Sequence, residues 1–182
     1  MTDEQIMQLV QKGRTDALGH LFDRYKRALY SYFVRMTADK ELSKDLTQNV
    51  FERVLRYGQS FKGGANVKSW LFQIARNVRS DHYRTQKIEL DEQVELGKLE
   101  AINASEKIDY SDKMDQVERA IQQLKPTYRE VLLMAWFEKM NYDDIAEALG
   151  ISKGNVKVRM HRAVSNLKNL IQKKTTYEAS TQ

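Results

Sequence analysis

The chain has 182 residues and carries 30 Lys and Arg against 25 Asp and Glu, a formal net charge of +5. A hydrophobic fraction of 41% excludes a fully disordered chain, and no apolar run reaches the roughly 18 residues of a membrane span. The N-terminus opens with acidic residues and lacks a secretion signal, so we expect a cytoplasmic protein without membrane insertion. The absence of cysteine excludes disulfides and thiolate metal sites, and with three histidines we expect no metal and no cofactor.

The charge is unevenly distributed along the chain. Residues 1–86 carry a net charge of +6, residues 87–113 carry −4 and residues 114–182 carry +3. Residues 151–174 hold seven basic residues and no acidic one. Two basic blocks joined by an acidic stretch predict two modules and a linker. Clustered basic faces are typical of nucleic-acid binding, and charge alone leaves an ordinary solvated helix surface open as the alternative.

Hydrophobic spacing predicts helices throughout the first block. A short helix ends near Gly13, and a longer one carries apolar residues at three- and four-residue intervals over residues 18–36. A third helix is predicted over residues 43–57, with Ser43 as its N-cap, and a fourth over residues 66–83.

The last block is also predicted to be helical. Four helices are expected, over residues 114–123, from Pro126 onward, over residues 142–149 and over residues 153–174. Asn141 and Ser152 are the expected N-caps of the last two helices, and Gly150 marks the turn between them.

The sequence therefore predicts an all-α fold of two small helical domains joined by a linker. The predicted segments are a first domain over residues 1–86, an acidic linker over 87–113, a second domain with a helix-turn-helix over 114–174, and a polar tail over 175–182. We expect the linker to act as a spacer and, in the free protein, to screen the basic helix of the second domain.

The basic helix has the layout of a DNA-recognition helix. At about 100° per residue, Val156, Met160, Val164, Leu167 and Ile171 form a stripe that faces away from Asn155, Val158, His161 and Arg162. Side chains in the first turns of such a helix enter the major groove, while flanking basic residues contact phosphates. An amphipathic helix of an ordinary bundle is the alternative, and the lack of acidic residues disfavours it.

These residues also carry a family resemblance. Residues 124–133, 142–152 and 154–159 resemble region 4 of bacterial sigma-70 family factors, in which the second helix of the motif reads the −35 promoter element. The contacts implied for the −35 element are Lys153, Asn155, Lys157, Val158, Arg159, His161 and Arg162. The family more often has Thr at the position of Asn155 and Ser at that of Val158, so the promoter sequence is not implied.

The first block resembles region 2 of the same family. Residues 45–54 resemble region 2.2, and residues 61–64, 67–77 and 81–84 resemble regions 2.3 and 2.4. This order is typical of the two-domain extracytoplasmic-function group. The resemblance implies a sigma factor that binds core RNA polymerase, through its β′ coiled coil and β subunit, and directs initiation at −10 and −35 elements while aiding DNA opening. It also implies promoter DNA and an anti-sigma factor as partners.

The chemistry of the helix over residues 43–57 independently favours a protein interface. With Val50 at the centre of its core face, Phe51 and Leu55 fall on a flank beside acidic side chains, an arrangement typical of an aromatic anchor with a polar border. The alternative is that Phe51 closes a wide core stripe. The predicted polymerase contacts are Asp45, Gln48, Asn49, Phe51, Glu52 and Leu55.

The helix over residues 66–83 carries a polar face opposite its apolar stripe. Asn and Gln have paired donors and acceptors for base edges, and Arg suits phosphates. By resemblance, this helix and the loop before it read the −10 element, with predicted contacts at Lys62, Asn66, Lys68, Arg76, Asn77 and Arg84. Trp70 and Phe72 have rings that stack on bases in other proteins, but aromatic residues at helical spacing more often belong to a core.

Two other functions stay open. One is a DNA-binding regulator that needs no polymerase, and the other is a nucleic-acid-modifying enzyme. The sequence holds no nucleotide-binding glycine loop and no paired histidines, so we expect no catalytic residue and no enzyme. His82 is expected to be a surface histidine.

Overall fold

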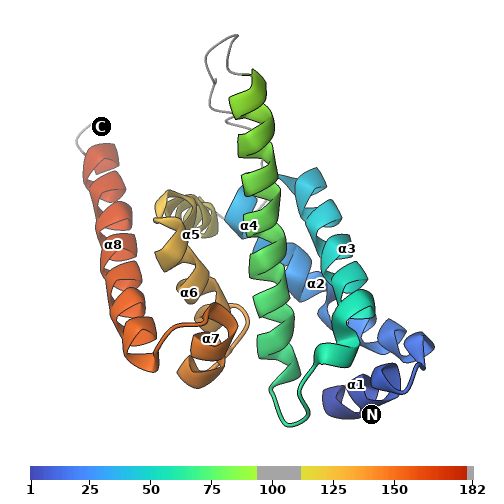
Figure 1. The fold of residues 1–182 in the computed structure, drawn as a ribbon. Coiled ribbons are helices and arrows are strands. Elements are labelled where there is room, and N and C mark those ends of the chain that lie inside the picture. Colours follow the sequence, from blue (N-terminus) through green and yellow to red (C-terminus); the bar gives the residue numbers. More distant parts are fainter. Residues whose placement is uncertain (94–111, 180–182) are drawn as a thin grey trace. The chain divides into compact units, whose positions relative to one another are not determined.

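The computed structural model describes residues 1–93 and 112–179. The described residues form helices and no strand, which confirms the predicted all-α class. In chain order the elements are α1 (Asp3–Gln11), η1 (Thr15–Ala17), α2 (Leu18–Thr37), α3 (Lys40–Tyr57), η2 (Gly58–Ser60), α4 (Val67–Gln93), α5 (Asp112–Gln123), α6 (Pro126–Trp136), α7 (Tyr142–Leu149) and α8 (Lys153–Ala179) (Figure 1). Across the two described ranges, no helix has the length and apolar character to cross a membrane.

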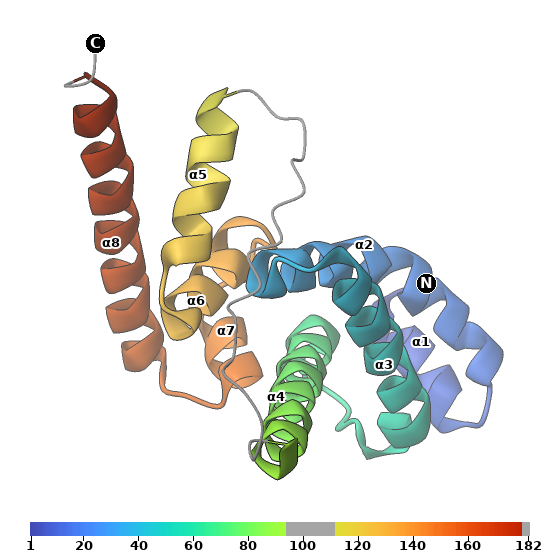
Figure 2. The same cartoon turned by 90° about the horizontal axis from the view of Figure 1, so that it is seen from above.

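The chain divides into two compact units. The first holds α1, α3, α4 and most of α2, and the second holds α5 to α8 together with Val34–Ala38 at the end of α2. In the first unit α3 packs along α4, while α1 contacts both 3-10 turns. In the second unit α8 packs against α5, α6 and α7 (Figure 2).

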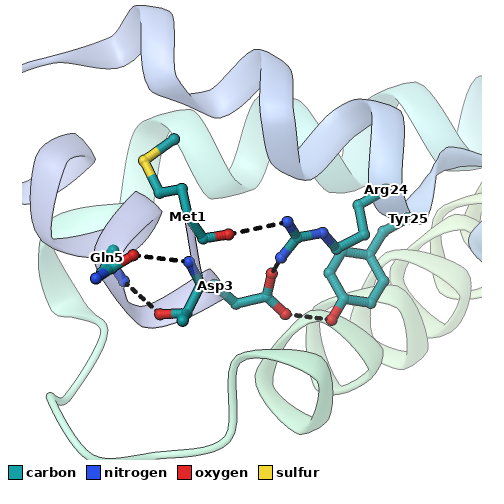
Figure 3. A network of polar contacts seen from close by, with 6 residues as sticks. Met1, Asp3, Gln5, Arg24 and Tyr25 are labelled. Atoms are coloured by element: carbon teal, nitrogen blue, oxygen red, sulfur yellow. Dashed lines mark hydrogen bonds and ion pairs between the residues drawn. The ribbon is translucent and has the colours of Figure 1, made fainter.

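Polar contacts tie the N-terminal helix α1 to α2 (Figure 3). The backbone N–H of Gln5 donates to Thr2 Oγ1 (3.3 Å), and the backbone N–H of Thr2 donates to Gln5 Oε1 (2.8 Å), which closes a capping box at the start of α1. The carboxylate of Asp3 accepts hydrogen bonds from Arg24 and from the hydroxyl of Tyr25, both on α2. Burial, with the Asp3 contact as a second cause, raises the pKa of Tyr25 well above its ordinary value.

The core of the first unit follows the predicted apolar stripes, with two differences on α4. Val50, predicted at the centre of the core face of α3, is fully buried, and so is Leu71 on the apolar stripe of α4. Ile74 is only half-buried, whereas Phe72 is fully buried and meets Tyr32 edge to face with ring centroids 5.4 Å apart. Phe72 therefore belongs to the core and is not available for stacking on bases.

Helix α3 begins three residues before the predicted start. Asp39 is its N-cap, and Asp39 Oδ1 accepts the backbone N–H of Leu42 at 2.9 Å. The prediction that Ser43 caps this helix is wrong: Ser43 is fully buried inside the first turns, and its hydroxyl donates to the carbonyl of Asp39. Asp and Ser are equally good N-caps, so composition alone does not choose between them.

Two helices run beyond their predicted ends. Helix α4 continues to Gln93, so the predicted domain boundary at residue 86 falls inside a helix, and α5 begins at Asp112. Residues 94–111 of the predicted linker lie outside the described residues, and so do the spacer and screening roles predicted for them. Helix α8 continues to Ala179, into the predicted tail, of which residues 180–182 are not described.

The core of the second unit lies between α8 and the three helices packed against it. Its buried members include Ile121, Leu132, Leu133, Met134, Ile145, Leu149, Val156, Ala163 and Leu167. On α8, Val156, Met160 and Leu167 are buried as predicted. Val164 and Ile171 are only half-buried, because the buried stripe shifts toward Ala163.

Candidate functional site

The helix-turn-helix of the second unit is fixed by local capping. Asn141 Oδ1 accepts two backbone N–H groups in the first turn of α7, each at 2.9 Å. Helix α7 ends at Gly150, whose φ of 62° is left-handed, and a Cβ there would meet no atom within 4 Å. The requirement for glycine is therefore conformational rather than steric. The Ser152 hydroxyl then accepts the backbone N–H of Asn155 at 3.2 Å and starts α8. These caps agree with the prediction.

The predicted DNA-contacting face of α8 is accessible. Its exposed members are Lys153, Asn155, Lys157, Val158, His161 and Arg162. Arg159 is half-buried, and the buried side chains of Val156 and Met160 hold the opposite side of the helix against the core. We call the seven predicted contacts the α8 face: Lys153, Asn155, Lys157, Val158, Arg159, His161 and Arg162. Polar, basic and apolar groups thus project together from the first three turns of one helix.

Lys153 has a partner that the sequence did not indicate. Its ammonium lies 2.7 Å from a carboxylate oxygen of Asp143 on α7, and both side chains are more than half exposed. An exposed ion pair of this kind is worth about 1 kcal/mol or less. A phosphate group can therefore replace Asp143 as the partner of Lys153 at little cost.

In the first unit, the loop before α4 presents two of the predicted −10 contacts to solvent. Lys62 and Asn66 are exposed, and Gly64 between them has a left-handed φ of 88°. Asn66 Oδ1 also accepts the backbone N–H of Ser69 at 3.1 Å, so its side chain helps to start α4. Trp70 is half-buried and meets Phe61 edge to face, with ring centroids 5.2 Å apart.

The polar face of α4 lies where the angular pattern places it. Gln73, Asn77 and Arg84 are exposed at intervals of about one or two helical turns. Of the remaining predicted −10 contacts, Lys68 and Arg76 are half-buried. The loop and the polar face of α4 therefore both lie on the surface of the first unit. We call their side chains Lys62, Asn66, Lys68, Gln73, Arg76, Asn77 and Arg84 the α4 surface.

A polar network joins α3 to α4. Arg53 of α3 donates to Asn49 Oδ1 (3.1 Å) and to the carboxylate of Asp81 on α4 (2.8 Å). The second oxygen of Asp81 accepts from Arg84 at 2.7 Å. Asn49, a predicted polymerase contact, is therefore linked through two side chains to Arg84, a predicted DNA contact. The sequence pattern does not indicate this network, because Arg53 and Asp81 are 28 residues apart.

The predicted polymerase-binding side of α3 forms part of a groove between α2 and α3. The structure differs from the prediction at Phe51, which is buried. Phe51 is only 7% exposed and lies edge to face against Phe22 of α2, with ring centroids 4.9 Å apart. This burial favours the alternative that Phe51 closes a wide core stripe, although Phe51 also lines the groove. Leu55, a predicted polymerase contact, is 52% exposed, and Phe22 of α2 is 40% exposed.

The groove has apolar walls and an acidic border. It is an open depression with a volume of about 470 Å³, lined by Thr15, Asp16, Leu18, Gly19, Phe22, Phe51 and Leu55. A hydrogen bond from Arg14 holds the pKa of Asp16 below its ordinary value. On α3, Asp45 and Glu52 are exposed, and Gln48 Nε2 donates to Glu52 Oε1 at 2.9 Å. Such a surface suits a partner that offers apolar side chains flanked by basic ones.

The ionisable side chains of the described residues form no candidate metal site. Among the residues that the structure describes, no three His, Asp or Glu side chains lie close enough together to hold a metal ion. His82 is half-buried on α4, with its ring 5.5 Å from that of Tyr83. The groove, the α4 surface and the α8 face are therefore the candidate sites.

Comparisons with known proteins agree with this division. The family described as Sigma-70 region 2 matches residues 21–88, and Sigma-70, region 4 matches residues 114–167. The sigma factor SigM of Bacillus subtilis is 30% identical over 154 residues, covering 84% of this chain and 94% of SigM. BldN of Streptomyces coelicolor is 27% identical over 173 residues, and the chain spans 65% of the length of BldN.

Two solved structures share the fold. CnrH, in a complex with the cytosolic domain of CnrY, matches with a TM-score of 0.71 at 22% identity, covering 93% of this chain and 97% of CnrH. The sigma factor RpoE of Bartonella quintana, in a complex with the anti-sigma factor NepR, matches with a TM-score of 0.72 at 23% identity, covering 85% and 96%. With regions 2 and 4 matched in family order, the chain belongs to the extracytoplasmic-function group of the sigma-70 family, the RNA polymerase sigma factors that direct promoter-specific transcription.

Proposed function

We propose that this chain binds core RNA polymerase through the α2–α3 groove and reads promoter DNA with the α4 surface and the α8 face. The observation that carries the proposal is the groove itself. Phe22 and Leu55 stand exposed at a groove that Phe51 and Asp16 also line, and the exposed Glu52 lies one helical turn before Leu55. Exposed apolar groups with a polar border are typical of a protein-binding surface.

The polymerase contact combines apolar burial with charge. The partner surface is the β′ coiled coil, with further contacts to the β subunit. Asp45 and Glu52 are positioned to meet basic side chains there, while Phe22 and Leu55 lose their remaining exposure to water. Asn49 contributes indirectly, since it accepts a hydrogen bond from Arg53 and carries no charge of its own.

The −10 element is read by the loop before α4 and by the polar face of that helix. Asn66 and Asn77 offer paired donors and acceptors to bases, and Lys62 offers its charge to a phosphate. Arg84 is 74% exposed although it is paired with Asp81, so a phosphate can compete for it. Preferential binding of the separated strand to this surface then favours the open state of the DNA.

The −35 element is read by the α8 face in the major groove. Asn155 and Arg162 are exposed on this face and have the geometry for bidentate contacts with adenine and guanine. Lys157 and Arg159 flank them and suit the phosphates on either side. This arrangement assigns base recognition to the first turns of α8 and phosphate binding to its edges.

An anti-sigma factor is the proposed regulator, since the RpoE structure contains the anti-sigma factor NepR. A protein that covers the α2–α3 groove would block polymerase binding directly. The proposed setting is the cytoplasm, where core polymerase acts. In this scheme the chain supplies recognition, and the polymerase carries out all the chemistry.

A gel-shift assay with and without core polymerase tests the proposal against a regulator that acts alone. Duplex fragments selected by the reconstituted holoenzyme are incubated with the purified chain, with core polymerase, or with both. We expect a stable, sequence-specific complex only when both are present. A tight specific complex of the chain alone, unchanged by core polymerase, would establish the regulator instead.

A further inference from the structure

One apolar side chain interrupts the α8 face. Val158 is 48% exposed, although its neighbours one turn away, Asn155 and Arg162, are polar or charged. Residues 151–174 hold no acidic residue, so this surface suits a polyanion. An exposed valine at the centre of such a surface has no use in phosphate binding.

The major groove offers one apolar group that fits this side chain. Each thymine presents a C5 methyl there, whereas the other base edges present hydrogen-bond donors and acceptors. The side chain of Val158 has two methyl groups and cannot donate or accept a hydrogen bond. It gains free energy from contact with a thymine methyl and gains nothing from a cytosine at the same place.

The position of Val158 relative to Asn155 indicates which base pair it meets. The two residues are three apart, which separates them by about 4.5 Å along the helix axis. Successive base pairs lie about 3.4 Å apart. With α8 lying along the major groove, the two side chains reach neighbouring base pairs rather than the same one.

We propose that Val158 determines specificity in the −35 contact by selecting a thymine through its C5 methyl, at the base pair next to that read by Asn155. This inference rests on the proposed function, because α8 must enter the major groove. A protein partner is the competing occupant of an exposed apolar residue. The polar and basic neighbours of Val158 disfavour it, since docking surfaces for proteins present larger apolar patches.

The test removes a single methyl group from the DNA. The holoenzyme, reconstituted with the full-length chain, first selects promoters from a library with a randomised −35 region. Each thymine of the selected element is then replaced in turn by deoxyuridine, which lacks the C5 methyl. We expect the replacement at one position to weaken binding about three- to five-fold, the contribution of one buried methyl.

Two variants assign the effect to this residue. Val158→Ala is expected to bind the selected promoter three- to five-fold more weakly and to bind the deoxyuridine form no worse than the thymine form. Val164→Ala is the matched control on the same helix, because Val164 is half-buried away from this face. It is expected to keep the full deoxyuridine penalty, and thermal unfolding checks that both variants are folded.

The possible results separate the inference from the function on which it rests. If deoxyuridine is neutral at every selected thymine, or if Val158→Ala keeps the penalty, the inference is overturned while promoter selection still supports the function. If the holoenzyme selects no −35 sequence, the proposed function fails and the inference fails with it. A penalty that disappears only in Val158→Ala supports both.

Discussion

Replacing Leu55 and Phe22 with alanine tests the α2–α3 groove as the polymerase-binding surface. Leu55 is 52% exposed and Phe22 is 40% exposed, so roughly half of each side chain is still available for burial at an interface. Complete burial of a large apolar side chain is worth about 1.5–3 kcal/mol. Each substitution should therefore cost about 1 kcal/mol of binding, a roughly five-fold rise in Kd, and the double variant about 2 kcal/mol, a roughly thirty-fold rise.

Fluorescence-anisotropy titration of labelled protein with core polymerase measures these changes. Tyr57→Ala is the matched control, because Tyr57 lies on the same helix and is also 52% exposed but does not line the groove. Thermal unfolding confirms that each variant is folded. The reasoning is refuted if the folded double variant binds core polymerase as tightly as the wild type, or if Tyr57→Ala weakens binding as much as Leu55→Ala does.

Three further predictions follow from burial, base recognition and ionisation. Phe51→Ala should lower the free energy of unfolding by about 3 kcal/mol, because a nearly buried ring is removed, and urea unfolding measures it. Arg162→Ala should cost about 1–3 kcal/mol and relax the preference at one base pair. Lys168 is exposed further along α8, and Lys168→Ala should weaken binding evenly and reduce the salt slope by about 1. Binding to a promoter panel at several salt concentrations separates these two effects, and a uniform loss in Arg162→Ala would reassign that residue to a phosphate. The pKa of Tyr25 is raised in the folded state, so its contribution to stability is present below about pH 10 and is lost as the pH rises further. Unfolding at about pH 8 and pH 11 should show that Tyr25→Phe loses less stability than the wild type over this interval.

Local signals predicted the helix-turn-helix well. The bounds of α7 and the cap at Asn141 agree with the prediction because the cap, the first turn and Gly150 all act within a few residues. The ends of α4 and α8 were missed. Their final turns have no regular apolar spacing, so hydrophobic periodicity gives no signal for where these two helices end.

The candidate surfaces differ in how far the sequence predicted them. The faces of α4 and α8 follow from angular position, since residues opposite a buried stripe on a single helix must point outward. The groove does not follow in this way, because the packing of α2 on α3 decides whether Phe22 or Phe51 is exposed. The pairing of Arg53 with Asp81 likewise depends on two helices meeting, which periodicity within one helix does not report.

Run-off transcription with purified core polymerase and the full-length chain on genomic fragments tests the central claim most directly. The account predicts discrete transcripts with defined start sites only when both components are present. It also predicts that the double variant Phe22→Ala and Leu55→Ala loses most of these transcripts, whereas Tyr57→Ala keeps them. The account would be contradicted if core polymerase alone produced transcripts from the same start sites, or if the complete mixture produced no transcripts.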